Sequence, residues 1–118
     1  MATFSRAMKM NKPGDFTRVF RQAKRSTGGG LTVLTVKNSA GHPRLGLAIA
    51  KKHIKLASGR NRLKRIIRES FRQHQADFEE IDIVVLSRPE VIKQSSKQIW
   101  MALEQHWETV VMQWQKES

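Results

Sequence analysis

The sequence predicts an α+β sandwich, in which helices pack on a small central sheet. Two segments rich in β-branched residues, 31–37 and 81–87, are typical of strands. Residues 94–115 repeat apolar side chains at helical spacing, and residues 57–73 separate apolar from cationic side chains at the same spacing. The expected order of elements along the chain is α-β-β-α-β-α, with one helix connecting two strands.

The first predicted helix covers residues 12–26, KPGDFTRVFRQAKRS, and is ended by the glycine-rich TGGG at 27–30. Pro13 suits the first turn of a helix because its missing N–H is not needed there. Phe16 and Phe20 are one turn apart and share a face. They either join the core or, beside basic residues, stack on single-stranded bases.

Two predicted strands follow, at 31–37 and 44–52, and we expect them to pair as a hairpin across a turn at 38–43. In the second strand, bulky residues alternate with small ones. One face should therefore be shallow enough for a ligand to approach the backbone. The small residues of that face are Gly46, Ala48 and Ala50.

Residues 57–73, ASGRNRLKRIIRESFRQ, are predicted to form an ordered helix with two different faces. At about 100° per residue, the apolar side chains fall on one side and most cations on the other. Ser58 is the expected N-cap. The apolar stripe contains Leu63, Ile66, Ile67, Ser70 and Phe71, and the other stripe contains Asn61, Lys64, Arg65, Arg68 and Arg72.

The cationic stripe predicts a negatively charged partner. Like charges at i, i+3 destabilise an isolated helix by a few tenths of a kcal/mol per pair, and only Glu69 offers local relief. Arginine predominates, and its planar guanidinium matches phosphate in a bidentate manner. A solvated surface helix is the simpler alternative, but such helices usually mix both signs of charge.

The last two predicted elements are a strand at 81–87 and a helix at 94–115. The strand is almost continuously apolar, as expected when both faces are buried. Along the helix, the apolar residues step along one side, so we expect that side and its tryptophans to pack on the core. The stripe consists of Ile99, Leu103, Trp107, Val110 and Trp114.

Charge is distributed unevenly over the 118 residues, whose formal net charge is +12. The basic residues concentrate before residue 76, whereas acidic residues exceed basic ones after it. This asymmetry favours a polyanion such as nucleic acid; an anionic membrane surface would need a free apolar helix face. We expect one domain over 1–118, loosely held at 1–10 and 115–118. With no signal peptide or apolar span of ~20 residues, a cytoplasmic location is expected.

No protein-borne active site is evident in the sequence. There is no cysteine, and the four histidines lack the spacing of metal ligands. His53 is read as incidental, and His42 and His106 as surface positions. An acidic patch could bind a divalent ion weakly but is read as a solvated loop; it contains Asp77, Glu79, Glu80 and Asp82.

Four blocks of sequence nevertheless resemble one known family. The segment RNRLKRIIRESFR at 60–72, preceded by GLAIAKK at 46–52, resembles the signature of the bacterial ribonuclease P protein subunit. DFTRVFRQAKRS near the start and DIVVLSRPE at 82–90 fit the same template in order and spacing. The segment HIKLASG departs from the usual lead-in, with Gly59 directly before Arg60.

The resemblance implies a protein partner of a catalytic RNA. That complex removes the 5′ leader of precursor tRNA by Mg²⁺-dependent phosphodiester hydrolysis, with the active site in the RNA. Mg²⁺ would be held mainly by RNA, with none bound tightly by the protein. The implied fold is like the second domain of ribosomal protein S5, with a left-handed βαβ crossover that breaks the usual right-handed rule.

The resemblance also assigns residues to two RNA surfaces in a complex of one protein and one RNA, with no DNA or membrane partner. Leader binding is implied for the shallow sheet face with Phe16, Phe20, Lys51 and Lys52. Contact with the catalytic RNA is implied for Arg60, Asn61, Arg62, Lys64, Arg65, Arg68 and, by its place in the stripe, Arg72.

Three other readings remain open at this stage. A general RNA-binding or ribosomal structural protein would share the cationic helix but would not promote leader removal. A DNA reader using 60–72 in the major groove would normally have a second helix just before it, where a strand is predicted instead. A stand-alone nuclease would cleave without an RNA partner.

Overall fold

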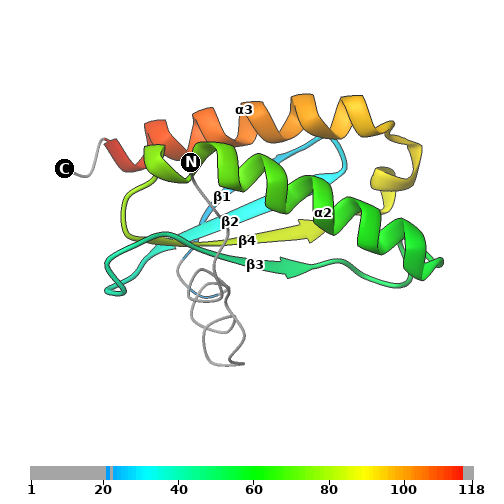
Figure 1. The fold of residues 1–118 in the computed structure, drawn as a ribbon, viewed down its shortest axis with the longest axis horizontal. Coiled ribbons are helices and arrows are strands. Elements are labelled where there is room, and N and C mark those ends of the chain that lie inside the picture. The colour runs from blue at the N-terminus through cyan, green and yellow to red at the C-terminus, as the bar shows by residue number, and fades with distance from the viewer. Residues whose placement is uncertain (1–20, 22, 116–118) are drawn as a thin grey trace.

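The computed structural model describes residue 21 and residues 23–115, and confirms the predicted α+β sandwich. In Figure 1, two long helices lie side by side over one face of a four-stranded sheet. The strands are β1 (Lys24–Gly28), β2 (Leu31–Lys37), β3 (Arg44–Ala48) and β4 (Ile81–Ser87). The helices are α2 (Ala57–His74) and α3 (Ser96–Gln115), with short 3₁₀ turns η2 (Gln75–Asp77) and η3 (Pro89–Lys93).

The order of strands across the sheet is β1-β2-β4-β3, so the predicted hairpin between the second and third strands is wrong. β4 lies between them, antiparallel to β2 and parallel to β3. The reason is burial: β4 is apolar along its whole length and takes a central position, whereas β3 alternates bulky and small residues and lies at an edge. The connection β3–α2–β4 is the βαβ crossover that the resemblance implies.

The first hairpin instead joins β1 to β2 through Gly29 and Gly30. Both glycines have positive φ, 62° and 83°, as a two-residue type I′ turn requires. The predicted helix over 12–26 is therefore wrong for residues 24–26, which pair with β2. Residues 12–20 and 22 of that prediction lie outside the described part of the chain. β3 is also shorter than predicted, because a turn at 51–53 follows it.

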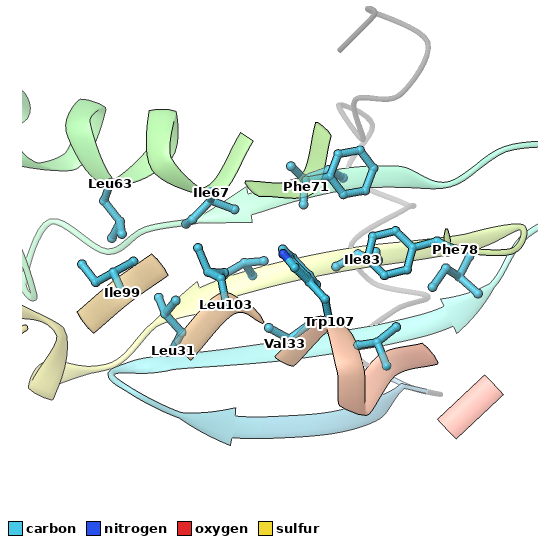
Figure 2. Packing of buried hydrophobic residues seen from close by; sticks show 14 of the residues in the cluster. Leu31, Val33, Leu63, Ile67, Phe71, Phe78, Ile83, Ile99, Leu103 and Trp107 are labelled. Atoms are coloured by element: carbon cyan, nitrogen blue, oxygen red, sulfur yellow. The ribbon is translucent and has the colours of Figure 1, made fainter. Parts of the chain in front are cut away.

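The main core fills the space between the helices and the sheet (Figure 2). The predicted stripes of α2 and α3 supply it, because their apolar side chains recur on the side that faces the strands. Trp107 packs edge-on against Phe71 and Phe78, with ring centroids 6.5 and 5.4 Å away. The labelled contributors are Leu31, Val33, Leu63, Ile67, Phe71, Phe78, Ile83, Ile99, Leu103 and Trp107.

A second, smaller cluster lies on the opposite face of the sheet. Leu34, Val36 and Val84 are buried there, with Ala48 and Leu86 packed against them. β4 is thus buried on both faces, as its continuous apolar run predicted. The small residues predicted for the shallow face lie partly there: Gly46 is buried, and Ala48 is half-buried.

A polar side chain buried inside the sandwich corrects a prediction. His106 is 4% exposed, not a surface residue. Its Nε2 lies 3.0 Å from the Gly28 carbonyl, and its Nδ1 lies 2.7 Å from the Ser26 hydroxyl. Both partners belong to β1, so this histidine attaches α3 to the edge strand. The sequence could not indicate this, because β1 itself was not predicted.

Asp82 provides a second correction, because it belongs to no solvated loop. Its side chain is fully buried in β4, and Arg44 donates to both carboxylate oxygens at 2.7 Å. Asn38 donates to one of the same oxygens at 2.8 Å. A buried carboxylate requires such partners, and here they hold the β2–β3 connection beside β4.

Candidate RNA interface

The cationic stripe predicted for residues 57–73 is a real face of α2. Its apolar side chains point into the core, where Leu63, Ile67 and Phe71 are buried. On the outer side, Asn61, Arg62 and Arg65 are exposed. The remaining cations of the stripe, Lys64, Arg68 and Arg72, are half-buried, so their aliphatic stems lie against the protein surface.

Two of the predicted RNA-binding arginines also make contacts within the protein. Arg60 folds back over the start of the helix and donates through one terminal nitrogen to the carbonyls of Ile54 and Lys55, both at 2.8 Å. Arg72 donates to Glu69 at 2.8 Å. This contact lowers the pKa of Glu69 and raises that of Arg72, so local charge compensation is greatest at the end of the stripe.

The start of α2 differs from the prediction. Leu56, not Ser58, is the N-cap, and no side chain caps the helix there. The first helical hydrogen bond runs from the Arg60 N–H to the Leu56 carbonyl. Gly59 has a steric role, because a Cβ at this position would lie 2.8 Å from a methyl of Ile54. Two residues of the unusual lead-in, Ile54 and Gly59, therefore pack closely against each other.

The loop from β3 to α2 brings more positive charge to the start of the helix. Lys51, Lys52 and Lys55 are exposed along it. A turn closed by the His53 N–H and the Ala50 carbonyl, 3.1 Å apart, sets the direction of this loop. At its base, the Ser87 hydroxyl accepts from the Ala50 N–H at 2.9 Å and lies 2.8 Å from His53 Nδ1.

The two predicted RNA surfaces meet in one groove at the start of α2. Lys52, predicted for the leader, and Arg62, predicted for the catalytic RNA, both line it, together with Lys55. Phe16 and Phe20, the other predicted leader residues, lie outside the described part of the chain. The groove also contains Leu56 and Ile92, which sequence reasoning did not select.

Little in the sequence marks these additional residues as functional. Leu56 and Ile92 are single apolar residues in polar surroundings, and such residues are common on protein surfaces. They become notable only because both line the same groove, and the fold alone brings them there. Ser87 ends a strand and gave no sign of its contacts with Ala50 and His53.

The chemistry that this surface supports is the binding of a polyanion. A row of arginines and lysines can neutralise phosphates and release their counterions. In residues 21 and 23–115, no three His, Asp or Glu side chains gather in a way that could hold a metal ion. Among the same residues, no helix has the length and apolar character needed to cross a membrane.

Comparison with known proteins identifies what the chain is similar to. A family model described as Ribonuclease P matches residues 4–111. The ribonuclease P protein component of Methylococcus capsulatus is 46% identical over 104 residues, which is 88% of this chain and 81% of that protein. That of Pectobacterium atrosepticum is 44% identical, covering 88% and 87%. The structure of the Staphylococcus aureus RNase P protein superposes with a TM-score of 0.78 at 31% identity, covering 83% of this chain and 90% of that one.

Proposed function

Because this chain belongs to the ribonuclease P protein family, we propose that its cationic surfaces hold two RNAs together for leader removal. The chain is the protein component of ribonuclease P, a tRNA-processing endoribonuclease that works as a ribonucleoprotein, and it associates with the ribonuclease P RNA. This membership sets aside the readings as a DNA reader, a stand-alone nuclease or a general RNA-binding protein.

The observation that carries the proposal is the division of α2 into a buried side and a cationic side. Its exposed arginines are held in a row by a helix whose other side is anchored in the core. A rigid row of guanidinium groups suits a folded RNA, whose phosphates are also fixed in space. We therefore propose that the outer face of α2 binds the catalytic RNA. The residues proposed for this contact are Arg60, Asn61, Arg62, Lys64, Arg65, Arg68 and Arg72.

The leader of precursor tRNA is proposed to bind next to this face. Lys51 and Lys52 are exposed at the turn that follows β3, where they can meet the phosphates of a single strand. Lys52 shares a groove with Arg62, so a leader bound here would pass beside the catalytic RNA. Phe16 and Phe20 are proposed to stack on leader bases, as the family resemblance implies.

The protein is proposed to act by reducing repulsion between the two RNAs. Its net charge of +12 offsets phosphate charge where catalytic RNA and substrate meet. Mg²⁺ is proposed to be held mainly by the RNA and to activate the attacking water there, with no protein side chain in the chemical step. We further propose that one protein molecule binds one catalytic RNA and that the complex works in the cytoplasm.

Reconstitution tests this function directly. The protein is added to a bacterial ribonuclease P RNA at low Mg²⁺, and removal of the 5′ leader from precursor tRNA is measured. We expect strong stimulation, because protein cations replace part of the Mg²⁺ needed to screen the two RNAs. A substrate with a leader of one nucleotide is the matched control, and it should be stimulated less. Equal cleavage with and without protein at every Mg²⁺ concentration would refute the proposal.

A further inference from the structure

We propose that the groove at the start of α2 receives an unpaired nucleotide of the catalytic RNA, with its base between Leu56 and Ile92. This inference rests on the proposed function and adds a specific contact to it. The groove lies between the loop before α2, the first turns of that helix, and η3. Its lining residues are Lys52, His53, Ile54, Lys55, Leu56, Ser58, Gly59, Arg62 and Ile92.

Two exposed aliphatic side chains are the first observation. Leu56 is 73% exposed and Ile92 is 64% exposed, the highest values among large apolar residues in the described part of the chain. They come from segments far apart in the sequence, yet both line the same groove. Neither contributes much burial to the fold. Aliphatic side chains of this kind contact base faces and insert between base steps where proteins grip nucleic acids.

The charges around Leu56 and Ile92 indicate which kind of molecule the groove would bind. Lys52, Lys55 and Arg62 line the groove, and no acidic residue does. A basic peptide or an uncharged apolar ligand would not match these three cations. A nucleotide does, since its flat base is apolar on both faces while its flanking phosphates are anionic. By contrast, the groove between α2 and α3 at their other ends is lined by Asp77, Glu104 and Glu108, so it has the wrong charge.

The walls of the groove are held by internal contacts. Gly59 allows Ile54 to lie against the helix, and Arg60 binds the carbonyls of Ile54 and Lys55. The Ser87 hydroxyl accepts from the Ala50 N–H and lies 2.8 Å from His53 Nδ1, so it holds the His53 ring beside the groove. The other ring nitrogen, Nε2, can donate to or accept from a base edge or a ribose 2′-hydroxyl, according to the tautomer.

The catalytic RNA is the occupant we assign, rather than the leader. Five of the nine lining residues, Lys55 to Arg62, come from the start of α2 or the residues just before it. They continue directly into the exposed face with Arg65 that is proposed to bind the catalytic RNA. The base must be unpaired, because proteins recognise RNA sequence and shape mainly at loops and bulges whose bases are free of the helix.

The double variant Leu56→Ser with Ile92→Ser tests the assignment. Both positions are exposed, so the variant should fold with an unchanged melting temperature. We expect affinity for the catalytic RNA to fall about tenfold, in line with the effect of removing one base-stacking contact. The salt dependence of binding should not change, because no cation is lost. The matched control is Met101→Ser with Met112→Ser, two methionines that are 59% exposed on α3 and should bind like the parent.

A crosslinking experiment identifies the occupant. A benzophenone side chain placed at position 56 in the reconstituted ribonucleoprotein should attach to one or two unpaired nucleotides of the catalytic RNA. The same group at position 101 should give no such product. Crosslinks mainly to the leader would overturn the assignment, as would unchanged affinity of the double variant. Failure of the parent protein to bind the RNA would instead refute the proposed function, and this inference with it.

Discussion

At the scale of single residues, the hydrogen bond between Trp107 and Ser70 illustrates how the core tolerates polar atoms. The indole N–H of Trp107 donates to the Ser70 hydroxyl at 2.7 Å, and both residues are almost fully buried. Ser70→Ala leaves this donor without its acceptor. We expect a loss of about 1–3 kcal/mol in the free energy of unfolding, measured by urea denaturation.

Thr109→Ala is the control for that change. Its hydroxyl also makes one hydrogen bond, to the Gln105 carbonyl at 3.0 Å, but on the exposed side of α3. Water can replace a partner there, so the expected loss is within about 0.5 kcal/mol. Equal losses for the two variants would show that burial of the indole is not what makes Ser70 important.

His106 makes stability depend on pH. Burial lowers the pKa of His106 below its ordinary 6.5, and the hydrogen bond to the Gly28 carbonyl offsets this only in part. The unfolded chain therefore binds a proton at a higher pH than the folded one. The contribution of neutral His106 to the free energy of unfolding is fully present well above pH 6.5. It is lost as the pH falls from there through the pKa of His106 in the folded chain. In urea denaturation between pH 7.5 and 5, the parent should lose stability relative to His106→Gln, which cannot titrate.

The difference between parent and variant is the quantity to measure. All other groups are the same in the two proteins, so their contributions cancel in the comparison. The stability advantage of the parent at pH 7.5 should shrink steadily toward pH 5. A constant difference across this range would mean that His106 has the same pKa in the folded and unfolded chains.

Local sequence patterns predicted which periodic residues are buried better than they predicted which distant residues form pairs. The periodicity of α2 and α3 placed Leu63, Ile67 and Trp107 in the core correctly, because burial follows from a repeat within one segment. His106 and Asp82 were misread as surface residues. Their burial depends on β1 and Arg44, which are distant in sequence, so no local pattern could reveal it. The predicted RNA contacts remain predictions, carried by the resemblance.

At the scale of elements, the β1–β2 hairpin shows a signal that was present but misread. Its strand β1 is polar on both faces, so it lacks the alternation by which strands are found. The two-residue Gly29–Gly30 turn was the better indication, since a Gly-Gly pair before a β-branched run is typical of a type I′ hairpin. The position of β4 between β2 and β3 had no local signal, because strand order is set by competition for burial.

Substitution of Gly30 tests how closely the turn of this hairpin packs against η3. A Cβ at Gly30 would lie 2.6 Å from the backbone Cα of Val91, and its φ is 83°. Gly41 has the same φ, but a Cβ there would meet nothing within 4 Å. Gly41→Ala should therefore cost only the backbone strain, about 1–2 kcal/mol. Gly30→Ala should cost clearly more in thermal or urea unfolding, because η3 must also move. Similar losses would mean that the close approach to Val91 is easily relieved.

At the scale of the whole molecule, positive charge is gathered where it serves binding at some expense of stability. The net charge of +12 is concentrated in the first part of the chain, and α2 repeats arginines along one face. Repulsion of this kind destabilises a compact fold, while the same charges attract phosphate. The sequence alone predicted this asymmetry and its polyanion partner, since charge is additive and needs no knowledge of the fold. It did not predict that the loop before α2 and η3 would flank the charged face with an apolar pair.

A substitution of Arg65 can measure both effects of the clustered charge, the gain in RNA binding and the loss in stability. Its side chain is exposed on α2, and Arg62 and Arg68 lie three residues to either side. Arg65→Gln should stabilise the free protein by a few tenths of a kcal/mol at ~50 mM salt. This gain should vanish near 1 M salt, where the screening length falls to about 3 Å. The same variant should bind the catalytic RNA more weakly, and the slope of log affinity against log salt should decrease in magnitude by about 1.

Lys97→Gln is the matched change, because it also removes one exposed cation from a helix surface but lies in the acid-rich part of the chain. Lys97 lies in the first turn of α3, where a cation opposes the helix dipole, so its loss should itself stabilise the free protein slightly and the comparison uses RNA binding alone. We expect Lys97→Gln to leave the affinity for the catalytic RNA and its salt slope unchanged. If it weakened both as Arg65→Gln does, total charge would suffice to explain binding. If only Arg65→Gln weakens them, the ordered row on α2 recognises the phosphates, because the two variants have the same net charge.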